Sequence, residues 1–411
     1  MFNRIILILR AFFLAKKKFK IPKKNKIVLY QHEGIELLNR YIKEDIVVLD
    51  PLREIYLFVL IKSILNFSFK DLLLNYNKTF ISITNPKIVF TYIDNDLKFY
   101  FLKDFFKDIT FVSIQNGYRG GINDKKYEKG YIDSMEGFNP LVSKIKRLKC
   151  DFILTFNKAV SKKYEKFIKT QTIVIGSIKN NIIKKKKNKT KKILSFISEA
   201  SIKKNFKQKI FFNNKKFKVT WNDWLSAEER IIPFLAQYCK KNDLKLQIIP
   251  KGTGKHEKIF YKNLIQNKYK YTYIDKKNSF DSYRVIDKSN YVVGISSSLA
   301  YEALSRKKKI AFLPIRQEIL TKKGFILDFK QFNFGWPHKF KRKGFFWTHI
   351  NSINEFERVL NFITKVSDQK WLKLVNNFND DFKIPHNENN SIFVNFLKNL
   401  GVKIRKKNIK I

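Results

Sequence analysis

Residues 291–316 read YVVGISSSLAYEALSRKKKIAFLPIR. The β-branched residues at its start predict a short buried strand, and the Gly- and Ser-rich turn that follows leads into a helical segment. A second apolar run, at 310–313, ends before Pro314. Strand, turn, helix and strand in this order form a βαβ unit, so this stretch predicts a parallel sheet.

The turn inside this unit carries three consecutive serines, Ser296, Ser297 and Ser298. It lies where a parallel strand ends and a helix begins, and the N–H groups and dipole of a helix N-terminus attract anions such as phosphate. Glu302 comes one helical turn after Ser298, so we expect it close to the same turn. One serine there often only caps the helix. Three serines with an acid one turn later favour a phosphate-binding site.

The same alternation of short apolar runs and amphipathic helical segments extends through most of the chain. A helix is expected over 34–44, and a polar, lysine-rich stretch at 201–220 is expected to be a loop. The pattern predicts an α/β protein with two Rossmann-like doubly wound domains facing a central cleft. This is the GT-B architecture, which glycosyltransferases share with nucleotide-sugar epimerases and phosphorylases, so it does not fix the function.

Changes of composition predict the domain boundaries. An N-terminal, acceptor-side domain is expected over 1–183, and the lysine-rich run at 184–192, which has no apolar residue, reads as a linker. A nucleotide-donor domain follows at 193–380. The last residues, 381–411, are expected to form a basic tail.

The formal net charge of +49 comes mainly from lysine. Much of it is explained by AT-rich codon usage, but a basic surface attracts phosphates, anionic lipids and nucleic acids alike. The lysines are spread along the chain without a zinc-finger or RNA-recognition signature, so no specific nucleic-acid partner is predicted. Cys150, Cys239 and the five histidines show no metal-ligand spacing. We therefore expect no bound metal and no cofactor.

The first twenty residues, MFNRIILILRAFFLAKKKFK, contain an apolar run that Arg10 interrupts. A membrane-spanning helix needs ~20 apolar residues, so this run is too short. A lysine cluster follows where a secretory signal would have its cleavage site. Two interpretations stay open: an amphipathic basic helix on a membrane surface, and an ordinary first helix.

Polar residues follow each predicted strand of the first domain. Deprotonation of an acceptor hydroxyl needs a carboxylate or an imidazole, and the candidates are Asp94, Glu33 and His32. Asp94 is preferred, with Glu33 second. The glycines of QNGYRGG permit a ligand to approach the backbone closely. The predicted acceptor-side residues from this segment are Gln115, Asn116, Gly117 and Arg119.

Residues after two further strands of the second domain could contact a nucleotide donor, either through a positive charge or through a glycine backbone that a ligand can approach closely. Lys251 and Gly252 follow one strand, although the loop is not a phosphate-binding GxxxxGK[ST] motif. Arg316 follows another, where its guanidinium either clamps a phosphate or forms a structural salt bridge. With Ser296, Ser297, Ser298 and Glu302, these residues make up the predicted donor site.

The chain resembles a family of bacterial surface-carbohydrate biosynthesis transferases from capsule and lipopolysaccharide gene clusters. The resemblance rests on SIQNGYRGG, DFILTFNKAVSKKY, VIGSIKNN, VVGISSSLAYEAL, KIAFLPIR, FGWP and GFFWT in this order, and it covers most of 50–371. The Ser-rich turn with YEAL is similar, more distantly, to CDP-glycerol glycerophosphotransferases, polysialyltransferases and capsule Kdo transferases. In those relatives the serines and the acid hold the nucleotide phosphates. Many of them carry His where this chain has Asn116, which shifts the expected base to Asp94.

This resemblance implies a metal-independent glycosyltransferase that uses a nucleotide-sugar donor, CMP- or UDP-linked, and a glycan or lipid-linked acceptor. It implies a cytoplasmic protein, peripheral at the anionic surface of the inner membrane. Three alternatives remain: a CDP-polyol phosphotransferase, a nucleotide-sugar epimerase and a non-enzymatic polyanion-binding protein. Neither the sugar nor the stereochemistry of transfer follows from the residues.

Overall fold

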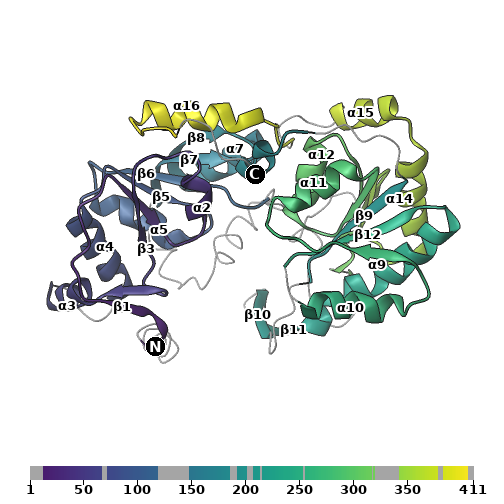
Figure 1. The fold of residues 1–411 in the computed structure, drawn as a ribbon, viewed down its shortest axis with the longest axis horizontal. Helices are drawn as coiled ribbons and strands as arrows, with labels where there is room; N and C mark the ends of the chain where they lie inside the picture. The colour runs from purple at the N-terminus through teal and green to yellow at the C-terminus, as the bar shows by residue number, and fades with distance from the viewer. Residues whose placement is uncertain are drawn as a thin grey trace. The chain divides into compact units, whose positions relative to one another are not determined.

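The chain forms two compact units, which the computed structural model describes in detail (Figure 1). Unit 1 takes its residues from 1–116, 135–175 and 390–411, and unit 2 from 117–134 and 176–389. The described residues are 13–66, 72–118, 148–185, 192–200, 207–212, 215–252, 255–316, 318–319, 342–377 and 383–405.

A parallel six-stranded sheet forms the centre of unit 1. Its strands are short runs of buried apolar residues, which suits a sheet covered on both faces. In chain numbering their order is 2-1-3-4-5-6, so the direction of winding reverses between β2 and β5. From edge to edge the strands are β3 (Ile46–Leu49), β2 (Ile27–Tyr30), β5 (Ile88–Thr91), β6 (Thr110–Ile114), β7 (Leu148–Thr155) and β8 (Ile168–Val174).

Helices and a small strand pair complete unit 1. The helix expected over 34–44 is short, because residues 41–43 instead hydrogen-bond to 403–405 near the C-terminus. The strand pair is β1 (Lys16–Lys18) with β4 (Glu54–Tyr56). The helices are α2 (Ile35–Leu38), α3 (Leu57–Asn66), α4 (Leu72–Thr84), α5 (Leu97–Leu102), the 3₁₀ turn η2 (Lys103–Phe105), α7 (Lys158–Phe167) and α16 (Ser391–Asn399).

Helix α16 replaces part of the expected basic tail. Its Phe393 packs edge-on against Tyr41 at 5.3 Å between ring centroids, and its Phe396 packs against Phe152 at 5.2 Å. Figure 1 shows this helix in yellow beside the earlier elements of unit 1. The apolar face of α16 therefore joins the core of unit 1, a contact that the basic residues after the helix hide in the sequence.

A second, mainly parallel sheet forms the centre of unit 2. Its first five strands follow the order 3-2-1-4-5, so the winding reverses between β9 and β14. Only the last pair is antiparallel. From edge to edge the strands are β13 (Tyr271–Tyr273), β12 (Lys245–Ile249), β9 (Ile193–Ile197), β14 (Tyr291–Gly294), β15 (Lys309–Phe312), β17 (Trp347–Thr348) and β16 (Lys343–Gly344).

The predicted βαβ unit over 291–316 is present as β14, α12 and β15. The predicted loop over 201–220 is wrong, because a two-stranded hairpin, β10 (Lys207–Phe212) and β11 (Lys215–Thr220), forms there. Its aromatic and β-branched residues favour strands, a signal that the interleaved lysines mask. The helices of unit 2 are α8 (Ile178–Ile182), α9 (Trp221–Lys241), α10 (Lys255–Ile265), α11 (Asp281–Lys288), α12 (Ser298–Ser305), α14 (Ile353–Lys365) and α15 (Asp368–Asn376), with the 3₁₀ turn η5 (Glu388–Asn390) at its end.

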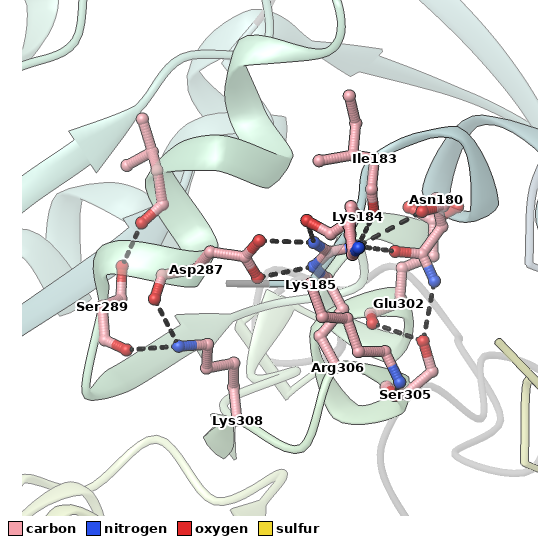
Figure 2. A network of polar contacts seen from close by, with 11 residues as sticks. Asn180, Ile183, Lys184, Lys185, Asp287, Ser289, Glu302, Ser305, Arg306 and Lys308 are labelled. Atoms are coloured by element: carbon pink, nitrogen blue, oxygen red, sulfur yellow. Dashed lines mark hydrogen bonds and ion pairs between the residues drawn. The ribbon is translucent and has the colours of Figure 1, made fainter. Parts of the chain in front are cut away.

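The long segment of unit 2 begins at Gly176, earlier than the boundary expected at 183. The cause is Arg306, whose buried guanidinium binds the Asp287 carboxylate through Nε at 2.7 Å and through Nη2. Nη1 donates to the Asn180 side chain at 2.9 Å and to the Ile183 carbonyl at 3.1 Å. Figure 2 shows Arg306 between these partners. Residues 180–183 are thus bound to α11 and α12 of unit 2.

Candidate functional site

In unit 2, one contact spans the point where the sheet reverses its winding. Glu199 follows β9 and Ser296 follows the neighbouring β14. The Ser296 backbone N–H donates to the Glu199 carboxylate at 2.5 Å, and Ser296 Oγ donates to it at 2.7 Å. Ligands of doubly wound sheets bind outside the carboxyl ends of the strands at such a reversal. The Ser-rich turn therefore lies where the fold favours a ligand.

Arg316 stabilises this arrangement from within. Its Nη1 lies 3.0 Å from Glu199, and its Nη2 lies 3.3 Å from both carboxylate oxygens of Glu228. All three side chains are buried. The guanidinium thus forms the structural ion pairs that the sequence left as the alternative to a phosphate clamp.

The two carboxyls beside Arg316 differ in pKa. Burial, together with the negative charge of Glu199, raises the pKa of Glu228 to about 7 despite the nearby guanidinium. Burial acts in the same direction on Glu199, but Arg316 and the hydrogen bonds from Ser296 outweigh it and hold the pKa of Glu199 below its usual value. Glu199 is thus the partner that keeps its charge near neutral pH.

The three serines of the turn have different roles. Ser296 donates its hydroxyl hydrogen to Glu199. Ser297 is the N-cap of α12, and its Oγ accepts from the Leu299 N–H at 3.3 Å. Ser298 Oγ accepts from the Tyr118 N–H at 2.7 Å. A hydroxyl that accepts in this way can still donate, so Ser297 and Ser298 are suited to bind an anion at this turn.

Tyr118 covers part of the same helix. Its ring stacks on that of Tyr301 with 3.8 Å between centroids and 4° between planes. Tyr118 therefore contacts α12 through both its ring and its backbone N–H. The adjoining Gly117, predicted on the acceptor side, is grouped with unit 2, and the predicted Arg119 lies outside the described residues.

Glu302 does not lie at the turn. Its buried carboxylate accepts a hydrogen bond from the Tyr283 hydroxyl of α11 at 2.9 Å and another from the side chain of Ser177, the N-cap of α8. Burial raises the pKa of Glu302. The Glu302 carboxylate thus links α12 to helices α8 and α11. It does not point toward the serines of the turn.

Lys251 and Gly252 form a turn that a buried acid holds. Their backbone N–H groups donate to the two oxygens of Glu257, at 3.0 and 3.2 Å. Ser198, which follows β9, also donates to Glu257. The Lys251 side chain is exposed. This strand end thus offers one ammonium group on a fixed backbone.

The reversal of winding in unit 1 is also spanned by a side-chain contact. Gln31 follows β2 and Asp96 follows the neighbouring β5. Gln31 Nε2 donates to one carboxylate oxygen of Asp96 at 2.5 Å, and the other oxygen accepts from the Lys98 N–H at 3.0 Å to cap α5. Each unit therefore has a polar pair at the site that its topology favours.

Asp94, the preferred base, is completely buried. Its carboxylate accepts from the Asn116 N–H at 3.2 Å and from the Tyr164 hydroxyl. Gln115 is buried beside it and accepts from the Phe156 N–H at 2.6 Å. Both side chains thus fix the turn after β6, and of the predicted acceptor group only Asn116 has an exposed side chain among the described residues.

Glu33 is the accessible one of the two predicted catalytic acids. Its carboxylate is 46% exposed and lies 3.5 Å from the guanidinium of Arg53. Arg53 also lies 3.4 Å from Asp50, a buried acid whose pKa is raised by burial. Because it is exposed, the Glu33 carboxylate can be reached by a hydroxyl group from the solvent side, although it also forms an ion pair with Arg53.

Sequence reasoning missed Glu199 and Glu228. Glu199 stands two residues beyond the end of the buried strand β9, and this position was a usable signal. Glu228 lies inside the long helix α9, and nothing in its local sequence marks it.

Within the described ranges, no group of three or more His, Cys, Asp or Glu side chains is arranged to hold a metal ion. The helices of those ranges also include none that is long and apolar enough to cross a membrane.

Comparison with protein families gives one match. The model of a family described as "putative O-antigen biosynthesis protein" matches residues 112–401, which is more than half of the chain. No curated protein matches the sequence.

Among solved structures, a UDP-GlcNAc 2-epimerase from Neisseria meningitidis is similar, with 10% identity, a TM-score of 0.47 and coverage of 91% of this chain and 99% of that one. The wall teichoic acid polymerase TagF has 10% identity, a TM-score of 0.46 and coverage of 92% and 90%. A glycosyltransferase from Rickettsia africae ESF-5 has 10% identity, a TM-score of 0.41 and coverage of 92% and 99%. With TM-scores below 0.5, these likenesses carry no argument about residues or activity.

Proposed function

Because the chain belongs to the family of O-antigen biosynthesis proteins that matches residues 112–401, we propose that it is a glycosyltransferase. It transfers a sugar from a nucleotide-activated donor to a surface polysaccharide or lipopolysaccharide glycan, free or lipid-linked. The observation that carries the proposal is the turn at Ser297 and Ser298, at the reversal of winding in unit 2. A helix N-terminus with hydroxyl donors is suited to the phosphate groups of such a donor.

In the proposed reaction, unit 2 holds the donor nucleotide. Ser297 and Ser298 donate to its phosphates, and Lys251 approaches them from the end of β12. Glu199 and Arg316 position the turn and do not touch the ligand. Stabilisation of the departing phosphate by these fixed donors is the main catalytic contribution. Activity that persists in EDTA would agree with a metal-independent mechanism.

Unit 1 supplies the acceptor side. We assign the deprotonation of the acceptor hydroxyl to Glu33, because its carboxylate is exposed. Asp94 acts as a positioning residue that holds the Asn116 backbone. The arrangement of the two units around a central cleft stays a prediction.

A nucleotide screen tests the donor site. The melting temperature of the full-length protein is measured with CMP, CDP, UDP and GDP, because ligand binding to the folded state raises it. We expect one nucleotide to stabilise the wild type and to lose most of its effect on Ser297→Ala. The matched control is Ser367→Ala, which removes the N-cap serine of α15. The control should respond as the wild type does.

The outcome separates the competing functions. If no nucleotide stabilises the wild type, the donor-site proposal fails. If Ser297→Ala and Ser367→Ala respond equally, the nucleotide binds elsewhere. A response to CDP with glycerol phosphate transfer would identify a CDP-polyol phosphotransferase, and turnover of a nucleotide sugar without an acceptor would identify an epimerase. Salt-sensitive binding to any polyanion without turnover would support a non-enzymatic protein.

A further inference from the structure

Helix α3 of unit 1 is apolar on two opposite sides. Phe58, Ile61 and Leu65 are 42%, 57% and 78% exposed, and their spacing of three and four residues puts them in one stripe. The other side of the helix faces the core, where Val59 and Ser63 are fully buried. Exposed apolar side chains that gather on one face are typical of a surface that contacts a partner or a membrane. The exposed stripe therefore needs an explanation beyond folding.

The strand pair β1–β4 leads directly into helix α3. The two strands run parallel with Lys18 opposite Tyr56, and α3 begins at the next residue, Leu57. The chain therefore leaves β1 beside the first turn of α3, and Figure 1 shows β1 and α3 at the same end of unit 1. Four exposed apolar side chains flank β1: Phe13 at 72%, Leu14 at 73%, Phe19 at 81% and Ile21 at 54%.

We call these seven side chains and the lysines among them the α3 face. Seven of the thirteen large apolar side chains that are exposed in the described residues lie here, so they are clustered and not scattered. Residues 13–25 contain six lysines and no acid. The acid of the neighbouring β4, Glu54, is paired with Lys18. Lysines thus lie close in sequence to exposed apolar side chains in this part of unit 1.

We propose that the α3 face docks unit 1 onto the surface of an anionic lipid bilayer. The apolar side chains enter the boundary between head groups and acyl chains, while the lysines meet the lipid phosphates. Charge alone does not single out this face, because lysines occur along the whole chain. The combination of charge with exposed aromatic and aliphatic groups does. The inference does not depend on the proposed transferase activity.

Vesicle sedimentation with the full-length protein tests the proposal. We expect binding to phosphatidylcholine vesicles that contain phosphatidylglycerol and little binding to phosphatidylcholine alone. The double variant Ile61→Asp, Leu65→Asp should bind at least about tenfold more weakly, because two side chains no longer enter the interface. The matched control is Ile259→Asp, Ile353→Asp, which adds the same charge at exposed positions of unit 2. Circular dichroism checks that both variants are folded.

A second variant tests the charge. Lys20→Gln, Lys23→Gln, Lys24→Gln removes three exposed lysines and should weaken binding to anionic vesicles on the order of a hundredfold. The proposal fails if the wild type does not bind anionic vesicles, or if the two aspartate variants lose affinity equally, which would indicate binding by net charge alone. It also fails if light scattering shows a dimer that the α3 variant dissociates while vesicles stay unbound.

Discussion

Glu199 accepts two hydrogen bonds from Ser296, a residue 97 positions further along the chain. The two residues end the neighbouring strands β9 and β14, so the contact closes the point where the sheet of unit 2 reverses its winding. Arg316 holds Glu199 from the other side. The geometry of the Ser-rich turn therefore depends on one buried ion pair.

Substitution of Glu199 tests this dependence. Glu199→Gln removes the charge that Arg316 meets, and breaking a buried pair costs about 3 kcal/mol of unfolding free energy. Chemical denaturation measures the loss. Glu229→Gln is the matched control, because Glu229 is an exposed glutamate of α9, and it should cost less than about 0.5 kcal/mol. Equal effects of the two variants would refute a structural role for the Glu199–Arg316 pair.

The raised pKa of Glu228 predicts a pH dependence. Its pKa is about 7 in the folded protein against 4.5 ordinarily, so between these values the folded state binds more protons than the unfolded state. The unfolding free energy should therefore fall as the pH rises from about 4.5 to about 7, by up to about 3 kcal/mol. Glu228→Gln should remove this slope. The lowered pKa of Glu199 acts in the opposite direction and only in more acidic solution.

Denaturation of the wild type and Glu228→Gln across this pH range provides the measurement. The difference between their unfolding free energies should change between about pH 4.5 and about pH 7 and stay constant above it. A difference that is the same at every pH would contradict the raised pKa.

Gly176, the first residue of the long segment of unit 2, has a backbone that favours glycine. Its φ is +71°, and a Cβ there would lie 2.2 Å from the Pro385 carbonyl oxygen. Gly176→Ala should cost about 3 kcal/mol or more through strain and steric conflict. Gly401→Ala separates the two causes, because Gly401 has φ +67° and nothing within 4 Å of the added atom. Only the backbone strain of about 1 kcal/mol should remain there, and a similar loss at both sites would exclude the steric term.

The C-terminal helix α16 should contribute to the stability of unit 1. Phe393 is completely buried, whereas its neighbour Ile392 is 39% exposed. Phe393→Ala should cost about 3–5 kcal/mol because it leaves a cavity against Tyr41. Ile392→Ala should cost less than about 1 kcal/mol. Thermal unfolding measures the loss of stability in both variants. If Phe393→Ala did not lower the stability, α16 would not be needed for the fold of unit 1.

Much of the fold follows from local sequence patterns. The predicted combination of two doubly wound α/β units is confirmed, because short apolar strands between amphipathic helices dictate parallel sheets. The predicted membership of a surface-carbohydrate biosynthesis family is confirmed by the family match. The hairpin over 207–220 was missed because lysines interrupt its apolar residues. Helix α16 was missed because the basic residues that follow it led to the expectation of a tail.

The candidate site was predictable only in part. Because Ser297 and Ser298 follow a predicted strand in the sequence, they were correctly placed at a strand-to-helix turn. The same rule could not separate Asp94, which is buried and hydrogen-bonded, from Glu33, which is exposed. Exposure depends on neighbours such as Tyr164, which lies seventy residues away from Asp94.

Periodicity and strand-end chemistry thus suffice to predict the individual strands and helices, the doubly wound class and the turn before α12, because these follow from residues close together in the chain. The partners of Glu199, Arg316 and Glu302 required the folded structure. A carboxylate that lies near a helix N-terminus in sequence has no fixed direction until other helices pack around it. Burial raises the pKa of Glu228, and it encloses Arg316 together with two acids. This burial arises only when segments more than eighty residues apart in the sequence come together.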